Sequence, residues 1–130
     1  MKLTVMGSSP AWPNPGGAQS GYLVDEKLLL DCGPGVLARL RQQNGWNWPA
    51  LEAIVITHWH LDHWGDLVPW VWGNMVGPGQ EREQPELWLP PLGRTRLRDF
   101  GARLGWEDMF ETSFRFRDYA EGVPFDAAGL

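Results

Sequence analysis

THWHLDHWGD, residues 57–66, is the stretch that decides how this chain is interpreted. All three histidines of the 130-residue sequence lie in it: His58, His60 and His63. The preceding LEAIVIT is apolar and β-branched, which predicts a buried strand that ends near Thr57. Chemistry-bearing residues of α/β proteins commonly lie where a strand opens into a loop. The stretch is therefore the first candidate for a functional site.

The spacing within this stretch brings imidazoles and a carboxylate toward one volume. In an extended loop His58 and His60 point to the same side, while Trp59 points to the other. The chain then has to bend, so that Asp62 and His63 face the same volume from a second direction. Imidazole and carboxylate suit zinc, or manganese or iron in a more oxygen-rich shell. We therefore predict a metal site. The alternative is a polar loop whose histidines cap the next helix and face solvent.

Length and composition indicate one domain, which we expect over residues 1–130. The net charge of −5 argues against a broad nucleic-acid surface. The single cysteine, Cys32, excludes an internal disulfide framework and suits a reducing compartment, so a cytoplasmic location is expected. We expect neither a signal peptide nor a membrane-spanning segment, because the apolar runs are too short.

Hydrophobic periodicity predicts alternating strands and helices. Strands are expected over residues 2–6, on both sides of a tight turn at 25–27, and over 53–57, 86–90 and 111–120. Helices are expected over 36–43, over a short segment at 64–74 that is interrupted at Pro69, and from about Pro91 to 105. This order is that of an α/β (α+β) chain.

Several other residues have two interpretations each. Asp31, at the end of a predicted strand, either supports a metal ligand and loop amides or caps the following helix. Cys32 is interpreted as a small buried residue rather than a reactive thiol. The loop at 8–20, with Trp12 at its tip, is either a wall of the site or a plain surface loop. The arginines of the last predicted helix favour a solvated face over a phosphate clamp: Arg94, Arg96, Arg98 and Arg103.

The order strand, T-H-x-H-x-D-H, then G-D at the head of a helix resembles the signature of the metallo-β-lactamase superfamily. KLTVMGSS, SGYLV and LLLDCGPG resemble the first strands and the glycine-rich segment of its ribonuclease Z-like and related phosphodiesterase branches. These matches run from Lys2 to Asp66. The resemblance implies half of a four-layer αββα sandwich, a mixed β-sheet with flanking helices, and metals at one edge of the sheets.

The resemblance also implies roles by motif position. His58 and His60 would bind a first metal ion, and Asp62 and His63 a second one, with zinc expected and manganese or iron as alternatives. Asp62 would in addition orient or deprotonate the attacking water. The implied activity is metal-dependent hydrolysis of a phosphodiester or other ester bond in a small molecule. A lactonase or thioesterase of the same fold is an alternative.

The chain departs from the family pattern after the histidine motif. Members of the family complete the site with another histidine, a bridging aspartate and a final histidine, but no histidine follows His63 here. The downstream carboxylates are expected to lie far from the loop: Asp99, Asp108 and Asp118. We therefore expect a truncated hydrolase, its amino-terminal half. The alternative is an inactive fragment that binds metal weakly or self-associates through an uncovered sheet face.

A second departure concerns the substrate. Ribonuclease Z-type enzymes carry an acidic residue after the first glycine of the segment that here reads DCGPG, and Pro34 stands at that place. No long insertion that could grip a tRNA lies between the histidines and ELWLP. RNA therefore ranks behind a small phosphodiester, ester or lactone as the expected substrate.

Overall fold

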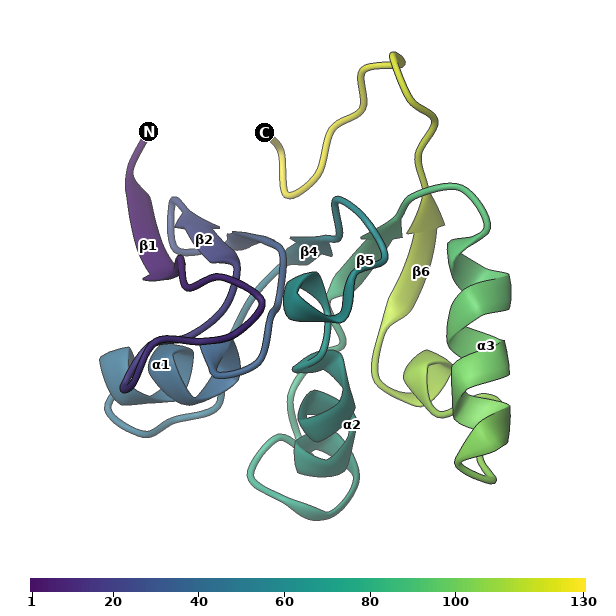
Figure 1. Cartoon of the computed structure of the whole chain (residues 1–130), viewed down its shortest axis with the longest axis horizontal. Helices are drawn as coiled ribbons and strands as arrows, with labels where there is room; N and C mark the ends of the chain where they lie inside the picture. The colour runs from purple at the N-terminus through teal and green to yellow at the C-terminus, as the bar shows by residue number, and fades with distance from the viewer.

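Six strands form one mixed sheet in the computed structural model, which describes residues 1–130 (Figure 1). They lie across the sheet in sequence order: β1 (Leu3–Gly7), β2 (Gly21–Val24), β3 (Leu28–Leu30), β4 (Ala53–Val55), β5 (Glu86–Leu89) and β6 (Arg115–Asp118). The first three strands pair antiparallel, and β3 to β6 pair in parallel. The predicted mixed sheet is confirmed.

A helix joins each parallel pair of strands, as parallel connections require. These helices are α1 (Val36–Gln43), α2 (Leu67–Val76) and α3 (Gly93–Arg103). The β2–β3 hairpin turns through residues 25–27, because Val24 pairs with Leu28. Asp25 and Glu26 have left-handed φ angles of 49° and 59°, which tight turns commonly need. None of the helices combines the length and apolar character needed to cross a bilayer.

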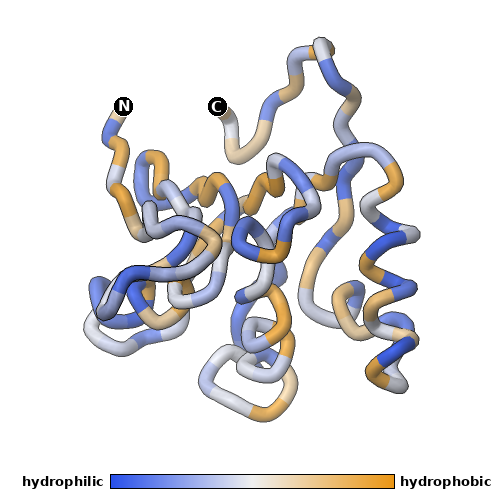
Figure 2. The backbone as a smooth tube through the Cα atoms, in the orientation of Figure 1, coloured by the Kyte–Doolittle hydropathy of each residue, from blue (hydrophilic) through white to orange (hydrophobic).

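Side-chain alternation explains why the three helices lie on one side of the sheet (Figure 1). Four cross-strand neighbours on β2, β3, β4 and β5 point to this side of the sheet and belong to the main core: Leu23, Leu29, Ile54 and Leu87. Figure 2 shows α3 alternating between hydrophilic and hydrophobic residues, as a helix with one buried face does. Each fully buried aliphatic side chain in this layer contributes about 1.5–3 kcal/mol.

The opposite face of the sheet is covered only in part. It carries a smaller apolar cluster: Val24, Leu28, Ala53 and Val55. The tail of the chain, residues 119–130, returns over this face and buries Ala127 and Ala128 against it (Figure 1). Leu3 and Val5, on the same face at β1, stay 61% and 54% exposed.

Two elements differ from the sequence-based expectation. Helix α2 runs unbroken through Pro69, so the predicted interruption is wrong. Pro69 is the third residue of the helix, where a backbone N–H has no intrahelical acceptor and the missing donor costs nothing. The last predicted strand is shorter than expected, because a 3₁₀ turn at Phe110–Thr112 precedes β6.

The arginines of α3 lie on a solvated surface. The Arg98 guanidinium forms ion pairs with the carboxylates of Glu111 at 2.7 Å and Glu107 at 3.4 Å. Arg94 lies over the ring of Phe116, with 4.9 Å between the guanidinium carbon and the ring centroid. These contacts agree with a solvated face and give no support to a phosphate clamp.

Candidate functional site

The histidine loop, residues 57–66, starts after β4 and returns to the end of β3. The backbone N–H of Cys32 donates to the carbonyl of His63 at 2.8 Å, and the N–H of Asp66 donates to the carbonyl of Cys32 at 3.0 Å. Cys32 is fully buried, which raises the pKa of its thiol, so its interpretation as a small buried residue is confirmed. The glycine-rich segment and the histidine loop are thus joined through their backbones.

Gly33 lets the two segments approach closely. A Cβ atom at this position would collide with the carbonyl oxygen of Asp62. The same carbonyl accepts a hydrogen bond from the backbone N–H of Ser20 at 3.2 Å. A side chain at residue 33 would therefore push the histidine loop away from the sheet.

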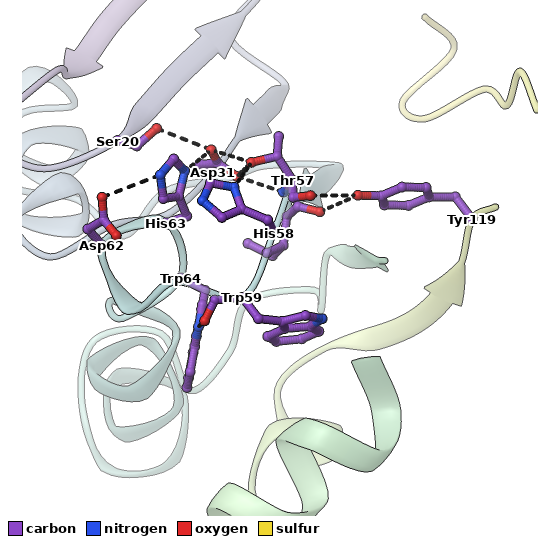
Figure 3. A network of polar contacts seen from close by, with 10 residues as sticks. Ser20, Asp31, Thr57, His58, Trp59, Asp62, His63, Trp64 and Tyr119 are labelled. Atoms are coloured by element: carbon purple, nitrogen blue, oxygen red, sulfur yellow. Dashed lines mark hydrogen bonds and ion pairs between the residues drawn. The ribbon is translucent and has the colours of Figure 1, made fainter. Parts of the chain in front are cut away.

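The three imidazoles lie together beyond the ends of β3 and β4. The ring centroid of His58 lies 5.0 Å from that of His60 and 3.8 Å from that of His63. The Asp62 carboxylate lies 3.3 Å from Nε2 of His63 (Figure 3). Trp59 points elsewhere and packs edge-on against Trp64. The four predicted ligands are therefore neighbours in space.

Asp31 connects this group to β3 (Figure 3). Its φ of 62° is left-handed, a conformation that aspartate tolerates better than most residues. The carboxylate lies 2.6 Å from Nδ1 of His63. It also accepts hydrogen bonds from the amide of Thr57 at 2.8 Å, from its hydroxyl at 2.9 Å and from the hydroxyl of Ser20 at 3.1 Å. Asp31 thus supports a candidate ligand, and the alternative that it caps the following helix is wrong.

These contacts determine which imidazole nitrogens stay free. Carboxylates only accept hydrogen bonds, and His63 has one beside each ring nitrogen: Asp31 lies 2.6 Å from Nδ1 and Asp62 lies 3.3 Å from Nε2. The shorter contact favours the neutral tautomer with its proton on Nδ1 and its lone pair on Nε2. The Thr57 hydroxyl donates to Asp31 and can therefore accept from Nδ1 of His58 at 3.1 Å. His58 then also keeps a lone pair on Nε2. In these tautomers both histidines would bind a metal ion through Nε2.

The donor types fit a cation of the zinc class. Imidazole nitrogens and carboxylate oxygens are its usual ligands, and a carboxylate behind a ligating histidine is a common supporting contact. No group of three or more His, Cys, Asp or Glu side chains converges on one ion-sized point. A site with three ligands from this chain alone therefore requires side-chain rotation within the loop.

Asp66 ties the histidine loop to a distant helix. Its carboxylate accepts a hydrogen bond from the backbone N–H of Leu37, in the first turn of α1, at 2.8 Å. It lies at the start of α2 but makes no side-chain cap there. Burial raises the pKa of the Asp66 carboxyl above its ordinary value. The sequence places Asp66 at the head of a helix and gives no sign that it caps a different one.

Three residues of the site were not predicted. Ser20 and Thr57 bind Asp31, and the hydroxyl of Tyr119 donates to the carbonyl of Ile56 at 2.6 Å. Of the three, only Thr57 could have been found from the sequence, because it directly precedes the first histidine. The side chain of Trp12, at the tip of the 8–20 loop, is 77% exposed. This exposure favours a surface loop over a wall of the site.

Comparison with known proteins shows which family the chain belongs to. The profile of the metallo-beta-lactamase superfamily matches residues 14–126. "Probable metallo-hydrolase YhfI" from Bacillus subtilis is 42% identical over 82 residues, which cover 59% of this chain and 32% of that protein. A ribonuclease Z from Salinibacter ruber is 39% identical over 104 residues, which cover 75% of this chain and 31% of that protein. A ribonuclease Z from Mycobacterium marinum is 26% identical, covering 100% of this chain and 51% of that protein.

A solved structure shares the fold. The crystal structure of the metallo-beta-lactamase fold protein YhfI from Bacillus subtilis matches with a TM-score of 0.71 and 24% identity, over 97% of this chain and 48% of that chain. The present chain thus spans about half or less of these relatives. On the match over residues 14–126, the chain belongs to the metallo-beta-lactamase superfamily.

Proposed function

We propose that this chain supplies the metal-binding, amino-terminal half of a hydrolase that cleaves a phosphodiester or another ester bond with water. One observation carries the proposal: three imidazoles and the carboxylate of Asp62 lie together, with the Asp31 carboxylate 2.6 Å behind His63. Membership of a family with metallo-hydrolase relatives supports the same chemistry.

The residues of this chain would hold the metal ion, orient its ligands and deprotonate the attacking water. The contacts of Asp31 and Thr57 would favour the tautomers in which His63 and His58 carry their lone pair on Nε2. Nε2 of His63 lies 3.3 Å from the Asp62 carboxylate. A divalent cation, when bound, makes water acidic enough to act as a nucleophile near neutral pH and polarises the substrate oxygen. The carboxylate of Asp62 would accept a proton from the attacking water.

Zinc titration of the purified chain by calorimetry tests the metal site. We expect the parent chain to bind zinc and Asp62→Ala to bind it at least about tenfold more weakly, because a ligand is lost. His58→Ala and His60→Ala should behave alike. Asp99→Ala, which removes an exposed carboxylate on α3, is the matched control. A parent chain that binds no zinc, or Asp62→Ala binding as tightly as Asp99→Ala, contradicts the proposal.

Substrate classes are separated by assays on the zinc-loaded chain. Bis(4-nitrophenyl) phosphate, a lactone and a thioester represent the three chemistries. Relatives named ribonuclease Z favour the phosphodiester, and the net charge of −5 favours a small substrate over RNA. Faster turnover of the lactone or thioester would favour those alternatives. Zinc binding without turnover of any substrate would favour the inactive fragment.

A further inference from the structure

Tyr119 reaches the root of the histidine loop from far along the chain. It follows β6, 63 residues after Ile56, and its hydroxyl donates to the carbonyl of Ile56 at 2.6 Å. The carbonyl of Thr57 lies at 3.4 Å from the same hydroxyl (Figure 3). A phenol has one proton, so the shorter contact takes the hydrogen bond. The bond therefore ends on the peptide group that leads into His58.

We propose that Tyr119 is a positioning residue, which fixes the backbone from which His58 and His60 project. Its role toward a metal ion rests on the function proposed above, whereas the contact itself does not.

A single peptide group, between Ile56 and Thr57, is bound at both ends. The carbonyl of Ile56 and the N–H of Thr57 belong to the same planar unit. The carbonyl is held by the Tyr119 hydroxyl at 2.6 Å, and the N–H is held by the Asp31 carboxylate at 2.8 Å. Because both ends of a rigid plane are bound, its rotation about the flanking bonds is restricted. The direction in which the chain enters the histidine loop is thereby fixed.

The phenol ring is itself held in place. It stacks on the ring of Phe125, with centroids 4.9 Å apart and 12° between the planes. Phe125 in turn stacks on Trp88 of β5 at 4.7 Å. The backbone N–H of Tyr119 donates to the carbonyl of Leu89 at 3.2 Å. The position of the hydroxyl is thus set by β5 and by the tail, independently of the loop that it binds.

The hydroxyl is a proton donor at neutral pH. Burial raises the pKa of Tyr119 above 10.0, and the negative charges of Asp31 and Glu121 raise it further. A phenylalanine would fill the same volume and keep the stack on Phe125. The hydrogen bond is therefore the one contribution that tyrosine adds at this position.

Amide hydrogen exchange in metal-free protein tests the proposal. Tyr119→Phe should increase the exchange rate of the Thr57 amide roughly three- to tenfold, because one hydrogen bond that resists local opening is lost. The control is Tyr22→Phe, which removes the chain's other phenol hydroxyl from a position on β2. An unchanged Thr57 rate in Tyr119→Phe overturns the proposal.

Zinc titration of the same variants links the contact to the ligands. Tyr119→Phe should bind zinc about three- to tenfold more weakly than the parent, while Tyr22→Phe should match the parent. Faster exchange with unchanged zinc affinity overturns the role toward the ligands. Tyr119→Phe could exchange faster at Thr57 while the parent chain binds no zinc. That result would support the positioning of the loop by Tyr119 and would contradict the metal site.

A second variant covers the case in which Tyr119→Phe does not fold. Phe125→Leu removes the ring that stacks on Tyr119 and leaves the phenol hydroxyl in place; Phe125 is 37% exposed, so the change is mild. It should also raise the Thr57 exchange rate, by a smaller factor. A folded Phe125→Leu with the parental Thr57 rate counts against the proposal.

Discussion

At the scale of single residues, Asp31 joins parts of the molecule that are far apart in sequence. One buried carboxylate accepts hydrogen bonds from Ser20 and Thr57 and lies against Nδ1 of His63. Its left-handed backbone turns the side chain from the end of β3 toward the histidine loop. The orientation of two candidate ligands therefore depends on one side chain that is not itself a predicted ligand.

Asp31→Asn tests this dependence. The substitution keeps the size of the side chain but presents an NH₂ group where only acceptors are tolerated, so Nδ1 of His63 or the Thr57 hydroxyl loses its partner. We expect zinc affinity to fall about 10- to 100-fold and the free energy of unfolding to drop by about 1–3 kcal/mol. The measurements are zinc calorimetry and urea unfolding. Asp118→Asn, at an exposed position on β6, is the control. Equal zinc affinity in the two variants would rule out the orienting role.

At the scale of elements, Asp66, at the start of α2, stabilises the first turn of α1. Asp66 precedes α2 but accepts the N–H of Leu37 in α1, whose own cap position, Gly35, has no side chain to offer. An acceptor at a helix N-terminus satisfies a backbone donor that has no partner within the helix. The two helices are thus connected through the end of the histidine loop.

The raised pKa of Asp66 makes this connection dependent on pH. Burial raises the folded-state pKa above 3.8, so stability is fully present below the unfolded pKa and is lost as pH rises through the folded pKa. Asp66→Asn keeps an acceptor for Leu37 and cannot ionise. Relative to the parent, it should gain stability as pH rises through that range. Urea unfolding at a series of pH values measures the difference.

Two further variants serve as comparisons for Asp66→Asn. Asp66→Ala removes the acceptor and should lower the free energy of unfolding by about 1 kcal/mol. Asp99→Asn, at an exposed position on α3, should show no comparable pH dependence. A stability difference between Asp66→Asn and the parent that stays constant with pH would refute the effect of burial on Asp66.

The order of strands and helices could be predicted because each element carries its own apolar period. Leu23, Leu29 and Ile54 lie in short apolar runs bounded by turn or loop residues, and these runs place the strands. The prediction failed at Pro69, where the effect of proline depends on its exact place in the first helical turn. It also overextended β6, because alternation continues into residues that form a turn.

The contacts of the site were less predictable. The histidines and Asp62 are close in sequence, so their spacing sufficed to bring them together. Tyr119 and Ser20 reach the loop only after the sheet has formed, and no local pattern marks them. Asp31 had two interpretations because its partner, His63, lies 32 residues away. Partners at such separations depend on tertiary structure.

At the scale of the whole molecule, the sheet has two unlike faces. Three helices cover one face, and the tail at 119–130 covers part of the other with Ala127 and Ala128. Beneath these lies a small apolar cluster, and Leu3 and Val5 remain exposed at its edge. We propose that this face, when uncovered, promotes self-association.

Ala127→Asp detaches the tail in a controlled way. A carboxylate has no partner at this buried position, so we expect the tail to leave the sheet and the free energy of unfolding to fall by about 1–2 kcal/mol. Light scattering coupled to gel filtration should then report species larger than 14.7 kDa. Ala120→Asp, at an exposed position in the same tail, is the matched control. A monomeric Ala127→Asp whose tail is detached would argue against association through this face.

The backbone bonds between Cys32 and the histidine loop have a kinetic consequence. Because folding of the sheet already anchors the loop at residues 63 and 66, the ordering entropy of its main chain is lost before any ion arrives. Only side-chain torsions are left to adjust, and these relax within nanoseconds. The rate at which the histidine loop binds an ion would then depend on diffusional encounter and on release of the ion's hydration water. It would not depend on refolding of the polypeptide.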